Sequence, residues 1–241
     1  ASAGDVARRS DLTLVCVMTS QQVEAVVADI SAAGRLAGKV LVDHSTTEIE
    51  ITKALATSLT AKTGMAFVDA PVSGGPGAAE TGTLAIMAGG DPVAIAKIAP
   101  IMRHLGRFTH MGAIGAGQAT KLVNQTLVLT NYCVMAEALR LAEAYGVDAR
   151  KVPEALATGH AGSNLLPVLF ERMIARDFTP KGYARQVLKD LEMLNSAAKE
   201  QHLAMPMSAQ ALTLFRMMVA SGKSELDGAA IKVNTRCQTS A

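Results

Sequence analysis

The chain of 241 residues has no tryptophan, and it contains only five phenylalanines and three tyrosines. Surfaces that bind single-stranded nucleic acids stack bases on aromatic side chains, so this scarcity argues against such a surface. The formal net charge is only +2 and no run of basic residues occurs. The chain therefore also lacks the electrostatic footprint of a polyanion-binding protein, and we expect no nucleic-acid partner.

Metal and disulfide patterns are also missing. The three cysteines, Cys16, Cys133 and Cys237, lie far apart, which fits a reducing compartment and no zinc site. The five histidines share no metal-ligand spacing, so we expect no metal. The first residues, ASAGDVARRSD, are polar and lack the apolar core of a signal peptide. We therefore expect a cytoplasmic location.

The first part of the chain alternates short apolar runs with helical segments. We expect helices from residue 19 or 20 to about 33, from a cap at 45–47 to about 62, and from about 92 to 104. Strands are expected at residues 12–18, 40–43, 67–70 and 84–88, with an edge strand at 106–110. This alternation predicts a Rossmann-like, doubly wound parallel sheet.

After residue 112 only helical patterns follow. They cover residues 118–145, 149–158, 164–175, 184–201 and 207–221. The segment 118–145 has no glycine or proline and is apolar nearly all round, which indicates either a membrane span or a buried core helix. Asn124, Gln125, Asn131 and Glu137 interrupt it, so we favour the core helix and expect no membrane partner. The predicted class is thus α/β followed by all-α, with domains at residues 1–112 and 113–241.

One expected feature of a dinucleotide-binding fold is absent. No G-x-G-x-x-G sequence follows any predicted strand, although that turn normally holds the pyrophosphate. The polar residues before the first strand look like the tail of a preceding unit. The strand at 12–18 would then be an exposed, apolar edge of the sheet.

Two stretches carry candidate chemistry. Lys121 opens the long helix with Asn124 and Gln125 at i+3 and i+4, which places all three side chains on one face. Burial would lower the pKa of the lysine and suit it to proton transfer, but taken by itself a lysine here more often reaches out to solvent. The sequence DAPVSGG at residues 69–75 follows a strand and offers a hydroxyl and bare backbone N–H groups for a carboxylate, or it is an ordinary loop.

Four stretches in this order resemble the β-hydroxyacid dehydrogenase family, which includes 3-hydroxyisobutyrate dehydrogenase and tartronate semialdehyde reductase and is related to 6-phosphogluconate dehydrogenase. They are DAPVSGG at 69–75, GTLAIMAGG at 82–90, GAIGAGQATKLVN at 112–124 and KDL at 189–191. The resemblance extends from about residue 10 to 234. It implies reversible hydride transfer between a short 3-hydroxy acid, or its semialdehyde, and NAD or NADP. The cofactor carries the hydride, so the protein need supply an acid/base, an anion clamp and positioning.

The resemblance also implies roles for single residues. Lys121 matches the catalytic lysine. The residues matching the substrate-binding positions are Ser73, Gly74, Gly75, Asn124 and Gln125, and those matching the cofactor-binding positions are Val17, Met18, Thr46 and Lys189. By itself Thr46 would be read as a helix cap, and Lys189 as half of a solvated pair with Asp190.

Two departures from the family leave alternatives open. Gln125 stands where several members have asparagine, which bears on substrate choice. We expect the Gly-rich first half of the nucleotide-binding domain to be missing from this sequence, so the doubly wound sheet would be incomplete and a non-catalytic, truncated dimerisation module is the alternative to an enzyme. An imine reductase on the same scaffold is a further possibility, which the retained lysine disfavours. The long apolar helix predicts a homodimer or homotetramer formed through the helical domain.

Overall fold

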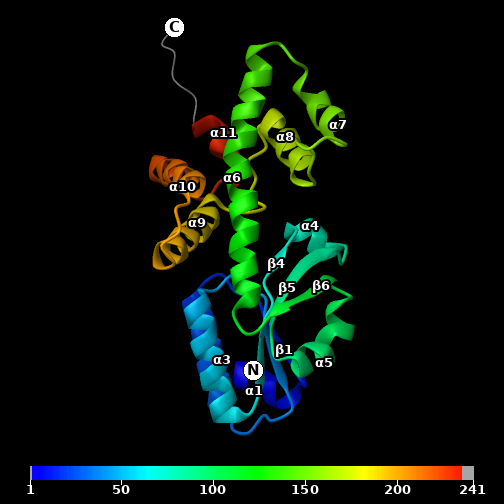
Figure 1. Cartoon of the computed structure of the whole chain (residues 1–241), viewed down its shortest axis with the longest axis vertical. Coiled ribbons are helices and arrows are strands. Elements are labelled where there is room, and N and C mark those ends of the chain that lie inside the picture. Colours follow the sequence, from blue (N-terminus) through cyan, green and yellow to red (C-terminus); the bar gives the residue numbers. More distant parts are fainter. Residues whose placement is uncertain (1, 235–241) are drawn as a thin grey trace. The chain divides into compact units, whose positions relative to one another are not determined.

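A computed structural model describes residues 2–234 and divides the chain into two compact units, Ala1–Asn124 and Gln125–Ala241. The first unit combines strands and helices, whereas the described part of the second is helical. Figure 1 shows the long helix α6 (Ala116–Ala144), which begins in the first unit and continues into the second. The predicted fold class, α/β followed by all-α, is confirmed.

The first unit is built on a mixed sheet. Its strands are β1 (Leu12–Val15), β2 (Val40–Asp43), β3 (Ala66–Asp69), β4 (Val72–Ser73), β5 (Leu84–Gly90) and β6 (Gly106–Gly112). The order is β1-β2-β3-β5-β4, and β6 pairs with β5. Strands β1, β2 and β3 are parallel, as are β5 and β6.

The prediction of an all-parallel sheet is wrong at β5, which runs antiparallel to β3 and β4. A parallel connection needs a crossover of a dozen or more residues, usually through a helix. Between β3 and β5 the chain forms only β4 and the six-residue helix α4 (Gly75–Glu80). Strand β4 therefore folds back on β5 as a hairpin arm, and neither β4 nor α4 was predicted.

Helices pack on both faces of the sheet (Figure 1). Residues of α1 (Ala3–Arg9), α2 (Ser20–Ser31) and α3 (Ile49–Thr63) form one core, and those of α5 (Pro92–Met102) form the other. No helix was predicted before β1, but the structure has one there. A capping box between Ser2 and Asp5 starts α1, which buries Ala7 completely.

Local signals placed most helix ends correctly. Thr19 caps α2 through a capping box with Gln22, and Gly64 ends α3 in the left-handed conformation with φ 74°, as glycine does at many helix ends. The predicted cap of α3 at residues 45–47 is wrong. The N-cap is Glu48, whose side chain makes no capping hydrogen bond. Ser45 and Thr47 instead bond the buried carboxylate of Asp43 at the sheet edge.

Strand β1 lies at the edge of the sheet, as predicted, and among the described strands it pairs with β2 alone. It ends at Val15 rather than at residue 18. The next backbone N–H groups leave the ladder: Val17 N donates to Ser45 Oγ at 2.9 Å, and Met18 N donates to Gln22 Oε1 at 2.9 Å. The chain thus turns at the carboxyl end of β1 directly into the cap of α2.

The second unit packs short helices beside α6. They are the α-helices α7 (Val152–Leu156), α8 (Leu165–Ala175), α9 (Ala184–Glu200), α10 (Pro206–Met218) and α11 (Ile231–Asn234), with the shorter turns η1 (Ala149–Lys151), η2 (Val219–Lys223) and η3 (Gly228–Ala230). These agree with the predicted helices, of which the one at 207–221 covers α10 and the first part of η2, while α11 and the turn η3 were not predicted. Cys237 lies outside the described residues.

The prediction that the long helix is buried all round is only partly correct. Leu122, Met135 and Leu139 are buried, but Leu127 is 63% exposed and Leu141 61% exposed in the single chain. Over the described residues, none of the helices has the length and apolar character needed to cross a bilayer.

A buried ion pair ties the second unit together. Arg172 Nη1 of α8 lies 2.8 Å from Asp227 Oδ2, and both side chains are almost fully buried. The same carboxylate accepts backbone N–H groups from Lys181, Gly182 and Ala229 at 2.9–3.0 Å. One carboxylate therefore neutralises a buried guanidinium and satisfies the backbone of two chain segments.

Asp227→Ala should lower the free energy of unfolding by about 3–5 kcal/mol, because the buried Arg172 loses its 2.8 Å partner and keeps the half-exposed Asp177, which lies 3.7 Å from Nε. Glu225→Ala is the matched control: its pair with Arg185 is at 2.9 Å but largely exposed, so its loss should cost less than about 1 kcal/mol. Urea unfolding of both variants measures the difference. Equal losses would show that burial does not set the strength of the Arg172–Asp227 pair.

Candidate active site

The carboxyl ends of β1, β2 and β3 meet at one edge of the sheet, where open α/β sheets bind their ligands. Backbone bonds connect these ends in sequence: His44 N donates to Val15 O, and Ala70 N donates to Asp43 O, both at 2.7 Å. Ser45 Oγ accepts the N–H of Val17 at 2.9 Å. The three strand ends thus form one connected rim.

The first turn of α6 is fastened to this rim by Asp69, the last residue of β3. The carboxylate is completely buried and accepts Gly115 N at Oδ1 and Gln118 N at Oδ2, both at 2.8 Å. The first N–H groups of a helix lack partners within the helix, and their dipoles favour a negative charge. Asp69 therefore caps α6 from a different element of the fold.

Two glycines allow α6 to approach so closely. A Cβ atom on Gly117 would lie 2.4 Å from Met87 O and 2.5 Å from Asp69 O, and one on Gly89 would lie 2.5 Å from Asp69 Oδ1. Such distances are not tolerated by real Cβ atoms. Gly89 of the 82–90 motif and Gly117 of the 112–124 motif are thus required where the helix start meets the strand ends.

Lys121 lies one turn further along α6 and does not extend into solvent. Lys121 is only 7% exposed, and its Nζ donates to the carbonyl oxygen of Val72 at 2.8 Å. Val72 belongs to the DAPVSGG bend. The structure therefore brings together the two stretches that the sequence singled out for chemistry.

The bend itself offers Ser73, Gly74 and Gly75. Ser73 is half-buried in β4, and the two glycines are exposed with φ 129° and 68°. A Cβ on Gly74 would lie 2.5 Å from the Cβ of Ala78, so this position needs glycine. Their positive φ values are ones that residues with side chains rarely adopt.

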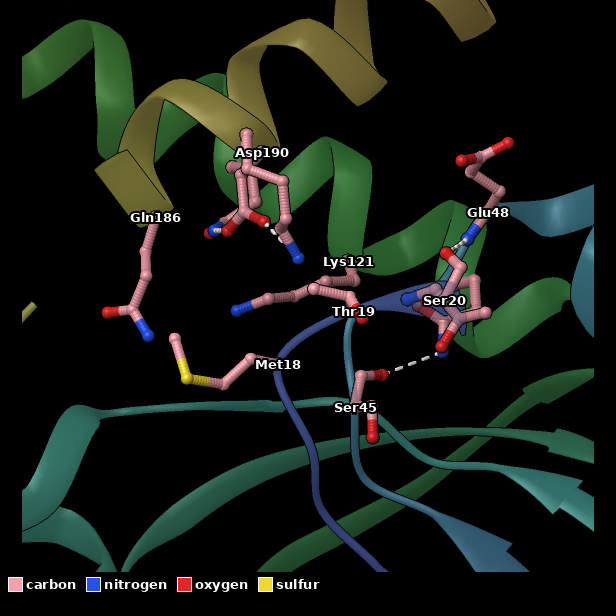
Figure 2. Close-up of polar contacts among 12 residues, drawn as sticks. Met18, Thr19, Ser20, Ser45, Glu48, Lys121, Gln186 and Asp190 are labelled. Atoms are coloured by element: carbon pink, nitrogen blue, oxygen red, sulfur yellow. Dashed lines mark hydrogen bonds and ion pairs between the residues drawn. The ribbon is translucent and has the colours of Figure 1, made fainter. Parts of the chain in front are cut away.

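The predicted cofactor contacts of the first unit lie on the rim. Val17 and Thr46 are half-buried and Met18 is 41% exposed. Figure 2 shows Met18 and Thr19 at the turn that follows β1, and Glu48 N donating to Ser20 Oγ at 3.4 Å. An exposed apolar side chain next to a hydroxyl-bearing loop at the strand ends is chemically suited to a nicotinamide ring and its carboxamide.

The remaining candidates lie at or beyond the boundary between the units. Asn124 is half-buried at the last position of the first unit. In the second unit, Asp190 of α9 accepts a hydrogen bond from Gln125 Nε2 and lies 3.1 Å from Lys189 Nζ. Asp190 thus holds two predicted site residues, Gln125 and Lys189, and its own side chain is 14% exposed.

Burial dominates the electrostatics of the rim. Desolvation raises the pKa of Asp69 to about 6, against the opposing hydrogen bonds from Gly115 and Gln118. Desolvation also raises the pKa of Asp43, the register partner of Asp69 on β2. His44 Nδ1 bonds Ala70 O at 2.7 Å, and desolvation lowers the pKa of this histidine. The rim therefore contains two buried carboxylates and an imidazole whose charged form burial disfavours.

Sequence reasoning assigned no site role to Asp43, Asp69 or Gln118, and it interpreted Ser45 only as part of a helix cap. Their only signal was an acidic residue at the end of each of two buried strands, and an amide in the first turn of the helix. Among residues 2–234, no group of three or more histidine, cysteine or acidic side chains is arranged to hold a metal.

Comparisons with known proteins identify the class of protein. Residues 1–115 match the family model of the NAD binding domain of 6-phosphogluconate dehydrogenase. Residues 115–233 match the model described as NAD-binding of NADP-dependent 3-hydroxyisobutyrate dehydrogenase. These two matches together define an NAD(P)-dependent oxidoreductase.

Individual relatives agree. The 2-hydroxy-3-oxopropionate reductase of Escherichia coli is 36% identical over 95% of this chain and 80% of its own length. The probable 3-hydroxyisobutyrate dehydrogenase-like 1, mitochondrial, of Arabidopsis thaliana is 33% identical over 93% of this chain and 68% of its own length. A solved 3-hydroxyisobutyrate dehydrogenase from Salmonella typhimurium superposes with a TM-score of 0.87 at 25% identity, over 96% of this chain and 82% of its own.

The chain belongs to the β-hydroxyacid dehydrogenase family, that of 3-hydroxyisobutyrate dehydrogenase. The resemblance expected from the four motifs is confirmed at this level. The match over residues 1–115 gives no support to the prediction that the first half of the nucleotide-binding domain is missing.

The raised pKa of Asp69 predicts a specific pH dependence of stability. Asp69 binds a proton more tightly in the folded state than in the unfolded state. Its contribution to the free energy of unfolding is therefore greatest below about pH 4 and is lost as the pH rises through about 6. A shift of this size corresponds to roughly 3 kcal/mol. Urea unfolding at several pH values should show that decline in the wild type and not in Asp69→Asn.

Asp5→Asn provides the contrast, because hydrogen bonds from Ser2 and the neighbouring Arg8 lower the pKa of this exposed carboxyl. Its small contribution should increase with pH instead. If wild type and Asp69→Asn show parallel curves between pH 4 and 7, Asp69 does not titrate as a buried, desolvated carboxyl.

Proposed function

We propose that the chain catalyses reversible, NAD(P)-dependent hydride transfer at the hydroxyl-bearing carbon of a short 3-hydroxy acid, with Lys121 as the general acid/base. The observation that carries the proposal is the buried Lys121 Nζ, which lies 2.8 Å from the carbonyl oxygen of Val72 in the DAPVSGG bend. A lysine held inside the fold by a backbone carbonyl is preorganised to exchange a proton with a group bound beside that bend.

The reaction balances with this one proton-transfer group. During oxidation the nicotinamide cofactor accepts the hydride from the hydroxyl-bearing carbon, and Lys121 accepts the hydroxyl proton. In the reverse direction Lys121 returns a proton to the carbonyl oxygen. Acting as a base requires an uncharged amine, a form that burial favours over the ammonium.

The other residues bind and orient. We assign the substrate carboxylate to Ser73 and to the backbone N–H groups of Gly74 and Gly75, which are exposed on the bend. Asn124 and Gln125, which follow Lys121 at i+3 and i+4, would donate hydrogen bonds to the substrate. Val17, Met18 and Thr46 at the strand ends and Lys189 of α9 would contact the cofactor.

The substrate class follows from the relatives. One relative is named for 2-hydroxy-3-oxopropionate and others for 3-hydroxyisobutyrate. Both names describe short acids that carry an oxygen function on the third carbon, counting the carboxyl carbon as the first, and we propose an acid of this type or its semialdehyde. The cofactor is NAD or NADP. We expect a cytoplasmic protein, although the Arabidopsis relative is named mitochondrial.

Lys121→Ala should lower kcat by roughly 10²–10⁴-fold, the usual contribution of a general acid/base. Lys121→Arg should be nearly as inactive, because arginine keeps the charge and donors but does not lose its proton. Lys62→Ala, an exposed lysine at the end of α3, is the control and should retain full turnover. Steady-state rates with a panel of short 3-hydroxy acids test this.

Titration of NADH and NADPH by nicotinamide fluorescence accompanies these assays. If the Lys121→Ala variant binds cofactor normally and also turns over at the wild-type rate, Lys121 is not part of the mechanism. Failure of the wild type to bind either cofactor at millimolar concentration would instead favour the non-catalytic dimerisation module.

We further propose that the helical unit mediates self-association. Leu127, Val134 and Leu141 of α6 are 63%, 47% and 61% exposed and are spaced by seven residues, close to two turns of helix. They form an apolar stripe along one side of α6. A stripe with this spacing is suited to packing against a second helix, and we expect a homodimer or homotetramer.

Leu127→Glu combined with Leu141→Glu should reduce the mass measured by sedimentation to that of a monomer, because it places two charges in the stripe. The control is Val93→Glu, which alters a residue that is 78% exposed on α5 and should leave the mass unchanged. A wild-type monomer, or a double variant that still assembles, would contradict the proposed interface.

A further inference from the structure

Gln118 occupies a position in the rim to which no role has yet been assigned. Its side chain is 1% exposed, and it lies in the first turn of α6. A buried amide has two donors and an acceptor to satisfy, so its partners are informative.

Both ends of the amide bond the same loop of the sheet edge. Oε1 accepts the N–H of Thr47 at 3.1 Å, and Nε2 donates to the carbonyl oxygen of Ser45 at 2.8 Å. The two loop groups are one donor and one acceptor, so only one orientation of the amide satisfies both. The backbone N–H of Gln118 in turn donates to Asp69. One residue therefore links the ends of β2 and β3 through α6.

The residues on either side of these bonds are those to which we assigned function. Thr46 lies between Ser45 and Thr47, the two residues that Gln118 holds. Lys121 follows Gln118 at i+3, on the same side of the helix. The loop that bears the proposed cofactor contact and the helix that bears the proposed acid/base are thus joined at Gln118.

The loop has a second, independent anchor. Asp43 Oδ1 accepts the N–H of Ser45 at 2.9 Å, and Oδ2 accepts the hydroxyl of Thr47 at 3.1 Å. These bonds lie within residues 43–47, so Asp43 fixes the loop to its own strand. The shape of the loop and its attachment to the helix are therefore held by different side chains.

We propose that Gln118 is a positioning residue that keeps the loop of residues 45–47 in register with the first turn of α6, so that Thr46 and Lys121 hold a constant separation. The inference rests on the proposed function, because it gives Thr46 the cofactor and Lys121 the proton. Asp69 fixes only the helix and Asp43 fixes only the loop, whereas the amide of Gln118 connects the two.

The test is a double-mutant cycle on cofactor binding. Thr46→Ala and Gln118→Leu should each raise the Kd for NAD(P)H, and the double variant should be hardly weaker than Gln118→Leu alone. We expect the two effects to be non-additive by at least about fivefold, since residues that share one contact couple while independent sites add. Gln118→Leu should also lower kcat about 10-fold or more, whereas Thr46→Ala should act mainly on the Kd.

The matched control is Gln210→Leu, the same change at an exposed glutamine of α10. It should leave both the Kd and kcat at their wild-type values. If Gln118→Leu does not fold, Gln118→Glu replaces it. A protonated glutamic acid can make both bonds of glutamine, so its Kd should improve towards the wild-type value as the pH is lowered from 8 to 5.

The outcomes separate this inference from the proposed function. Effects of Thr46→Ala and Gln118→Leu that simply add, or a Gln118→Leu enzyme with wild-type kcat, would overturn the role of Gln118 alone. An unchanged Kd in Thr46→Ala would overturn the proposed cofactor contact and this inference with it. A fully active Lys121→Arg would refute the proposed acid/base, while the Kd cycle, which needs no turnover, would still show whether Gln118 holds the loop.

Discussion

The attachment of the α6 start to the end of β3 is the constraint on which the candidate site depends. A helix normally leaves its first N–H groups to water or to a local cap. Here the buried carboxylate of Asp69 takes the N–H groups of Gly115 and Gln118. Desolvation makes this arrangement costly for the carboxylate, while the helix dipole favours its charge. Gly89 and Gly117 make it sterically possible.

The chemistry follows from this attachment. Because the helix start is fixed on the rim, Lys121 reaches the carbonyl oxygen of Val72 instead of solvent. Strand β4 continues from Val72 into Ser73, so the same hairpin arm that holds the lysine also presents the proposed carboxylate clamp. The proposed proton-transfer group and the proposed anion site are thereby positioned by a few buried hydrogen bonds within one unit of a chain of the hydroxyacid dehydrogenase family.

How much the sequence could predict depended on how local each signal was. The buried strand β2 and the cap of α2 at Thr19 are encoded within a few residues, and both were predicted correctly. Helix α1 was missed because it is short and polar, and β4 and α4 were hidden in a run of proline and glycine. The reversal of β5 depends on the length of the connection, which strand patterns do not show.

The network of the rim could not be predicted in the same way. Asp69 and Gly115 are 46 positions apart in the chain, and Gln118 and Ser45 are 73 apart. No periodicity connects residues at such separations. Asp69 and Gln118 were therefore recognised only as members of their motifs, and the hydrogen bonds they make were not predicted. Lys121 was singled out because a basic residue in an apolar helix is unusual, but its burial against Val72 required the fold.

The most direct test of this account is native-state hydrogen exchange of the backbone amides of Gly115 and Gln118. Helix-starting amides usually exchange rapidly, whereas amides bonded to a buried carboxylate exchange only when the structure opens. We predict that both amides are protected at pH 7 to the level of the β2 and β3 core. Exchange at the rate of an unprotected helix start would contradict the attachment of α6 to Asp69.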